Sequence, residues 1–135
     1  MVSLLHGLTE SEPLLAFASP PDQQETAEIL QRIRADLHPG QLAFVDDQHT
    51  EILGLCAGYG SGKTHALAAK TCALALANQG HTGCVMEPTG PLVRDIWLND
   101  FEAFLERYEI PYTFRASPLP EVILHLPGGD TNLVC

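Results

Sequence analysis

A glycine-rich run between two apolar stretches constrains the fold of this chain more than any other feature of its sequence. The run reads AGYGSGKT from Ala57 to Thr64, with the apolar stretch Ile52–Cys56 before it and an alanine-rich stretch from Ala66 after it. This order predicts a strand, a phosphate-binding loop and a helix, because glycines let backbone N–H groups close around an anion at the positive end of the helix. We therefore expect an α/β domain.

The residue types of the loop fit a Mg-nucleoside triphosphate. Lys63 supplies a compact charge for the β- and γ-phosphates, so it is the expected catalytic residue, and the Thr64 hydroxyl is the expected Mg²⁺ ligand. Ala57 stands where the full pattern has a glycine, so the match is to a relaxed form, and a turn that only joins a strand to a helix is the alternative. The residues expected to bind ATP in this loop are Ala57, Gly58, Tyr59, Gly60, Ser61, Gly62, Lys63 and Thr64.

Composition limits what the loop can belong to. A chain of 135 residues with 45% hydrophobic content can form one compact domain with a core. Seven basic and seventeen acidic residues give a net charge of -10, which opposes a broad nucleic-acid footprint and otherwise keeps a domain soluble. No apolar run reaches membrane-spanning length, and the N-terminus lacks the basic region of a secretory signal. We expect a cytoplasmic protein with no membrane partner.

The chain before the loop divides into two parts. Residues 1–22 show no sustained period, and we expect a mobile leader there. Residues 23–37 place apolar side chains four positions apart, which predicts a helix. The domain is therefore expected to span residues 23–135 as a partial P-loop ATPase domain.

Two candidates lie between this helix and the loop. Gln41, some twenty residues before the loop, has an amide that can both donate to and accept from an adenine edge, although a Gln at a helix start is commonly just solvated. Residues 42–47, LAFVDD, resemble the hydrophobic strand with an acidic end that holds Mg²⁺ in a Walker B motif. Their position argues against this assignment, because in the additional-strand P-loop class the Walker B strand follows the loop.

Downstream of the loop, helical and strand patterns alternate. A helix over residues 63–78 followed by a strand over Thr82–Glu87 predicts a parallel pair with the strand before the loop. The fold predicted is an α/β, three-layer P-loop NTPase domain with a mainly parallel sheet, incomplete, that ends in a β-hairpin. The remaining expected elements are helices over residues 91–98 and 99–108 and strands over residues 112–115, 122–126 and 132–135.

Cysteines and histidines show no metal-ligand spacing. Cys56 and Cys84 lie in predicted strands, and we expect them to be small core residues in a reducing compartment. We expect no metal other than Mg²⁺.

Four motifs occur in a recognisable order along the chain. They are His38-Pro39-Gly40-Gln41, the AGYGSGKT loop, EPTGPLVRD at residues 87–95, and YTFRASPLPEVILHLPGGD from Tyr112. In this combination the sequence resembles the N-terminal ATPase portion of phage terminase large subunits, the DNA-packaging motor proteins. The resemblance covers about residues 22–135, and the loop alone is generic to P-loop proteins.

The resemblance implies ATP hydrolysis coupled to the translocation of double-stranded DNA into a procapsid in the host cell cytoplasm. It implies ATP and Mg²⁺ as cofactors, portal protein and small terminase subunit as partners, and a homo-oligomer in the full-length motor. It also implies that Gln41 contacts adenine and that residues 58–64 hold the phosphates and Mg²⁺.

Two departures from the family's pattern qualify these implications. Many terminases carry an arginine where this loop has Tyr59, and the sequence stops at Cys135, before the family's Walker B aspartate, catalytic glutamate and nuclease residues. We expect a chain that binds Mg-ATP but hydrolyses it slowly or not at all alone. The alternatives are another P-loop ATPase of helicase-like type, and a non-catalytic nucleotide-binding fragment or gene remnant.

Overall fold

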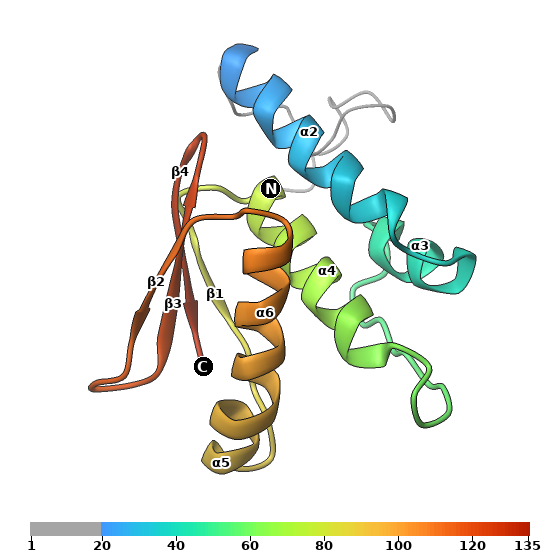
Figure 1. Cartoon of the computed structure of the whole chain (residues 1–135), viewed down its shortest axis with the longest axis vertical. Coiled ribbons are helices and arrows are strands. Elements are labelled where there is room, and N and C mark those ends of the chain that lie inside the picture. The colour runs from blue at the N-terminus through green and yellow to red at the C-terminus, as the bar shows by residue number, and fades with distance from the viewer. Residues whose placement is uncertain (1–19) are drawn as a thin grey trace.

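The computed structural model describes residues 20–135, which form a four-stranded sheet with helices packed against it (Figure 1). Most of the leader predicted at residues 1–22 lies outside the described residues, and residues 20–22 begin the first helix. The elements in chain order are α2 (Pro20–Ala35), α3 (Pro39–Asp46), α4 (Lys63–Ala77), β1 (Thr82–Cys84), α5 (Gly90–Leu92), the π-helix η1 (Val93–Leu98), α6 (Asn99–Arg107), β2 (Tyr112–Arg115), β3 (Glu121–Leu126) and β4 (Gly129–Val134).

The sheet is mixed, with the strand order β1-β4-β3-β2. Strands β1 and β4 pair in parallel, whereas β4 with β3 and β3 with β2 pair antiparallel. The predicted C-terminal hairpin is confirmed, and its two-residue turn is Pro127-Gly128. The prediction of a mainly parallel sheet is wrong, because the last three strands follow one another through short turns, which join antiparallel neighbours.

The strand predicted before the phosphate loop, at Ile52–Cys56, does not form. Its residues have no regular secondary structure; Ile52 is exposed, and only Leu53 and Leu55 are half-buried. Strand β1, its expected parallel partner, pairs with β4 instead. An apolar run favours an extended backbone, but a strand forms only when it pairs with another strand. The local pattern does not specify which segment that is.

The core lies between the sheet and the helices. Figure 1 shows the described helices on one side of the sheet, with α4 and α6 next to it and α2 beyond α4. Val122 and Leu124 of β3 have no exposed surface, and the small residues of α4 allow this helix to approach closely. The α/β class is therefore confirmed, while a three-layer arrangement stays a prediction.

The two helical stretches predicted after β1 form one continuous run through α5, η1 and α6. Asn99 does not cap a helix, because the backbone of the preceding Leu98 is already helical, and its side-chain amide donates to the Asp95 carbonyl. Aromatic side chains of this run fill the core: Trp97 and Phe101 are buried, and their rings stack with centroids 4.5 Å apart. Ile96, next to Trp97 in sequence, is exposed.

The cysteines depart from the prediction in part. Cys56 and Cys84 are exposed, so their assignment to the core is wrong, whereas Cys72 on α4 is buried. The strand assigned to Cys56 does not form, and Cys84 lies in β1 at an exposed position of that strand. Among residues 20–135, none of the helices has the length and apolar character that a membrane span requires.

Candidate phosphate-binding site

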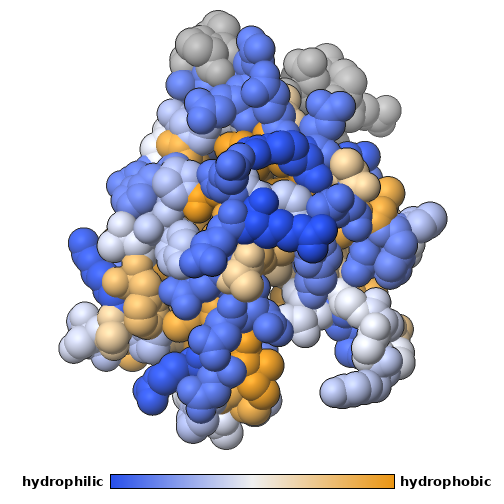
Figure 2. All heavy atoms as spheres, viewed as in Figure 1, coloured by the Kyte–Doolittle hydropathy of each residue, from blue (hydrophilic) through white to orange (hydrophobic). Residues whose placement is uncertain are grey.

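The predicted phosphate loop precedes α4 and projects from the body of the molecule (Figures 1 and 2). Gly60 and Gly62 have φ angles of 73° and 80°, a left-handed backbone that residues with a Cβ seldom adopt. The Ser61 amide donates to the Gly58 carbonyl, with N and O 3.4 Å apart, which closes a turn. Tyr59 is fully exposed at the tip of this turn.

Lys63 is the first residue of α4 and reaches back across the loop. Its Nζ donates to the Ala57 carbonyl oxygen at 2.8 Å and to the Gly58 carbonyl oxygen at 2.6 Å. An ammonium group has three donors, so one donor remains after these two bonds. The loop is thus folded around the positive charge that the sequence assigns to phosphate binding.

The start of α4 keeps its backbone donors available. The N-cap residue is Gly62, and no side chain caps the helix there. Because the first N–H groups of a helix have no acceptor inside it, they are left to bind water or an anion at the positive helix end. Together with the Lys63 ammonium, these donors fit a phosphate group.

Gln41 lies against the last glycine of the loop. Its Nε2 donates to the Gly62 carbonyl oxygen at 3.0 Å, and a Cβ on Gly62 would come within 2.6 Å of that nitrogen. Its Oε1 accepts from the His38 backbone N–H, and the Gln41 backbone N–H donates to His38 Nδ1. The two residues thus form a capping box at the start of α3. The structure therefore brings the sequence-predicted Gln41 to the loop but shows its amide in structural hydrogen bonds.

A cavity of about 360 Å³ opens beside the loop, between α4 and α6. Thr64 lines it from α4, and Asp100 and Arg107 line it from α6. Within the part of the chain that the structure describes, the Thr64 hydroxyl and the Asp100 carboxylate make no hydrogen bond or ion pair. Arg107 is instead paired with Asp36, whose Oδ2 is 3.0 Å from Nη2.

His65 separates this cavity from the helical core. Its ring packs on Phe104, with centroids 5.2 Å apart. Burial lowers the pKa of His65, and the nearby Arg107 guanidinium lowers it further, against the opposing charge of Asp36. The imidazole next to Thr64 is therefore held neutral at physiological pH, and it does not add a second positive charge to that of Lys63.

Two charged residues of the motif at residues 87–95 make no hydrogen bond to the loop. Glu87 follows β1 and is half-buried, and Arg94 lies in η1 with its side chain exposed. No hydrogen bond joins either side chain to a loop residue among those described. Likewise, residues 20–135 contain no cluster of three His, Cys, Asp or Glu side chains arranged to hold a metal ion.

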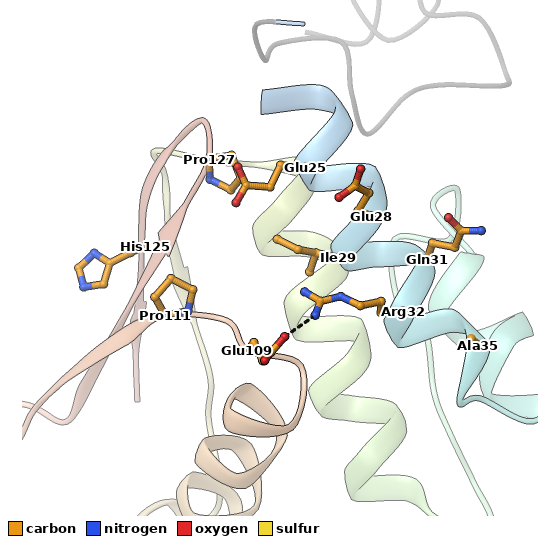
Figure 3. A pocket seen from close by; sticks show the side chains of 10 residues that line it. All are labelled: Glu25, Glu28, Ile29, Gln31, Arg32, Ala35, Glu109, Pro111, His125 and Pro127. Atoms are coloured by element: carbon orange, nitrogen blue, oxygen red, sulfur yellow. Dashed lines mark hydrogen bonds and ion pairs between the residues drawn. The ribbon is translucent and has the colours of Figure 1, made fainter. Parts of the chain in front are cut away.

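The larger cavity of the molecule, about 610 Å³, lies elsewhere and contains none of the predicted site residues. Figure 3 shows it between α2, the turn before β2 and the hairpin, with the Arg32–Glu109 ion pair, 2.9 Å from Nη1 to Oε2, across it. Two further carboxylates, Glu25 and Glu28, project into it from α2. This acidic groove is unsuited to a triphosphate.

Three contributors to the site escaped sequence reasoning. His38 holds Gln41 in its capping box, and its position three residues before a Gln was the available signal. Lys70 donates to the Val45 and Asp47 carbonyls at the end of α3 and so holds α3 against α4. No sequence pattern marked Asp100, because it lines a cavity with Thr64 only through the packing of α6 on α4.

Comparisons of the chain with protein-family models, with curated proteins and with solved structures find no match. The case for a function therefore depends on the loop geometry and on the sequence motifs.

Proposed function

We propose that this chain is the ATP-binding part of a phage DNA-packaging motor, a terminase large subunit, built on a P-loop NTPase fold. The observation that carries the proposal is the glycine loop at the uncapped start of α4, folded around Lys63. A glycine turn that only joins two elements does not need a lysine ammonium next to an uncapped helix start. Here both are present at one place, and both have hydrogen-bond donors left for a ligand.

The residues of the loop have separate roles toward the nucleotide. The backbone N–H groups at the start of α4 and the Lys63 ammonium bind the phosphates, and Lys63 is the residue that stabilises charge during phosphoryl transfer. The Thr64 hydroxyl, free within the described chain, is a ligand for Mg²⁺. Mg-ATP supplies the phosphoanhydride bond whose hydrolysis drives the motor.

Gln41 is buried against the loop and positions it, and we propose that it also takes part in base recognition. Its amide already uses one donor on Gly62 and one acceptor site on the His38 amide. A primary amide has a second N–H and a second lone pair, which is the pair of groups that an adenine edge requires. Gln41 thus has both a structural contact and the capacity for the adenine contact expected from the sequence.

The assignment to a packaging motor draws on the order of the sequence motifs around this loop. The motor would couple ATP hydrolysis to double-stranded DNA translocation in the host cytoplasm, with portal protein and small terminase subunit as partners and several copies assembled. The net charge of -10 is consistent with DNA contacts that are confined to a small area of this domain or lie outside it.

The test is Mg-ATP binding by the chain, measured by calorimetry, in wild type, Lys63→Ala and Lys70→Ala. The sequence contains only these two lysines, and both lie on α4, so they form a matched pair. We expect saturable binding by the wild type and a loss of about 10- to 100-fold in Lys63→Ala, because a hydrogen bond to a charged group contributes about 1.5–3 kcal/mol.

Lys70→Ala provides the control for charge and helix stability. Its ammonium holds the end of α3, so the variant should be less stable but bind Mg-ATP as the wild type does. A folded wild type that does not bind Mg-ATP, or equal losses in both variants, would overturn the proposed function.

A further inference from the structure

The cavity between α4 and α6 is lined both by the proposed Mg²⁺ ligand and by a carboxylate. Thr64 lines it at the start of α4, and Asp100 lines it in the first turn of α6. These two residues are 36 positions apart in sequence, and only the packing of the two helices brings them to one cavity. In Figure 2, seen as in Figure 1, the loop that precedes Thr64 projects from the body of the molecule at the lower right.

Neither oxygen-bearing group has a protein partner among residues 20–135, and the Asp100 carboxylate is open to solvent. The Thr64 hydroxyl makes no hydrogen bond there, and the Asp100 carboxylate makes neither a hydrogen bond nor an ion pair. The third polar group of the cavity, Arg107, is bound to Asp36 and stacks over the Tyr108 ring at 5.7 Å. The cavity therefore contains a neutral and an anionic oxygen ligand and a cation that is already neutralised.

A hydroxyl and a carboxylate are ligands that Mg²⁺ commonly takes at a nucleotide site. Mg²⁺ in nucleotide sites keeps several waters and takes one or two carboxylates in addition to the phosphates. A threonine hydroxyl carries no charge, so the loop residues Ala57–Thr64 alone supply no anionic ligand. Asp100 is the only carboxylate among the residues that line this cavity with Thr64.

We infer that Asp100 supplies the carboxylate of the Mg²⁺ site at the phosphate loop, in contact with the ion directly or through one coordinated water. The inference rests on the proposed nucleotide function and extends it to a residue outside the loop. In the absence of Mg²⁺ the same carboxylate repels the triphosphate, because both are negative. Asp100 therefore makes nucleotide binding depend on the metal in a way that a purely structural residue does not.

The experiment measures the Kd for ATP by calorimetry in excess Mg²⁺ and again in EDTA, for wild type, Asp100→Asn, Asp100→Glu and Asp95→Asn. Asp95 lies in η1, is exposed and does not line the cavity, so its variant controls for loss of one surface charge. Thermal unfolding of each variant checks that the fold is retained. Asp100 is exposed in a continuous helical run, so its variants should fold.

We expect Asp100→Asn to bind ATP about tenfold more weakly than wild type in Mg²⁺, the usual scale for a lost metal contact. In EDTA it should bind as tightly as wild type or more tightly. Asp100→Glu should recover part of the Mg²⁺ enhancement, and Asp95→Asn should keep all of it.

The inference is overturned if wild type binds Mg-ATP and Asp100→Asn keeps the same ratio of the two Kd values. It is also overturned if the variant loses affinity equally in Mg²⁺ and EDTA, because such a loss reports a change of fold. In either case the proposed nucleotide function stands. Absence of ATP binding by the wild type in both conditions would overturn both proposals together.

Discussion

Two glycine turns within residues 20–135 are each held by a glutamine, and only one of them is proposed as a binding site. At the phosphate loop, Gln41 donates to the Gly62 carbonyl. At the hairpin turn between β3 and β4, Gln79 accepts from the Gly128 amide. A Cβ on Gly62 would meet Gln41 Nε2 at 2.6 Å, and a Cβ on Gly128 would meet Gln79 Oε1 at 2.7 Å. In both turns the glutamine occupies the space that a side chain would need.

The two turns differ in which backbone group the glutamine takes. Gln41 occupies a carbonyl, so the N–H groups at the start of α4 stay available for an anion. Gln79 occupies an N–H, and the hairpin ladder takes the groups around it. Glycine content therefore does not distinguish the two turns; the proposed phosphate loop differs by having a cation next to the free N–H groups of a helix start.

The largest effect should come from Gly62→Ala, which displaces the Gln41 amide from the loop. At φ 80° an added Cβ costs about 1–2 kcal/mol, and displacement of the Gln41 amide adds about 1 kcal/mol. We expect the free energy of unfolding to fall by about 2–3 kcal/mol and Mg-ATP binding to be lost. Urea unfolding and calorimetry measure the two effects.

Gly128→Ala is the matched variant at the hairpin turn. Its backbone is not left-handed, and the flexible Gln79 side chain can move aside, so the cost should be at most about 1 kcal/mol, the value of one hydrogen bond. Mg-ATP binding should be unchanged. Equal losses of stability in the two variants would contradict the contrast between the turns.

Replacement of each glutamine by alanine sharpens the comparison, with a smaller effect on binding. Gln79→Ala removes bonds to Gly128, Leu76 and the Thr26 hydroxyl, which is fully buried, and should cost about 2–3 kcal/mol of stability with no change in Mg-ATP affinity. Gln41→Ala removes two bonds and should cost about 2 kcal/mol.

Only the Gln41 variant should also bind Mg-ATP more weakly, because Gln41 holds the residue that precedes Lys63. Calorimetry measures the Mg-ATP affinity of both variants at a temperature where each is folded. An affinity loss in Gln79→Ala that matched the loss in Gln41→Ala would show that general stability, and not the loop contact, sets the affinity.

The sequence predicted the local parts of this arrangement and missed the parts that depend on distant partners. The loop, the helix after it and the C-terminal hairpin follow from glycine positions, alanine content and two-residue alternation, which are encoded within a few residues. The prediction of a strand at Ile52–Cys56 was wrong, because β1, its expected partner, pairs with β4 instead. No local pattern specifies a ladder between segments some fifty residues apart.

The same distinction applies to the candidate site. Lys63 was predicted from the glycine-rich pattern and Gln41 mainly from the family resemblance, and in the structure both side chains donate to carbonyls of the loop. How Gln41 uses its amide could not be predicted, because His38 and Gly62 compete with any ligand for it. Asp100 could not be predicted either, since the π-helix η1 sets the rotation of α6 and hence the residues that face α4.

A similarly small effect should come from Tyr108→Phe, which tests how α6, next to the proposed phosphate loop, is attached to the end of α2. The Tyr108 hydroxyl donates to Asp36 Oδ2 at 3.0 Å, and burial, followed by this carboxylate, raises the pKa of Tyr108 to about 12. Between pH 10 and 12 the unfolded chain loses the phenol proton while the folded chain keeps it, so stability falls as pH rises. Below pH 10 this contribution is fully present.

We expect Tyr108→Phe to cost about 1 kcal/mol at pH 7 and to lose less stability than wild type between pH 9 and 11, as measured by urea unfolding. Tyr59→Phe is the control, because the Tyr59 ring is fully exposed in the phosphate loop and should leave both values unchanged. If Tyr108→Phe lost stability with pH as steeply as the wild type, the alkaline transition would belong to other groups. The attachment of α6 to α2 through Asp36 would then depend on Arg107 alone.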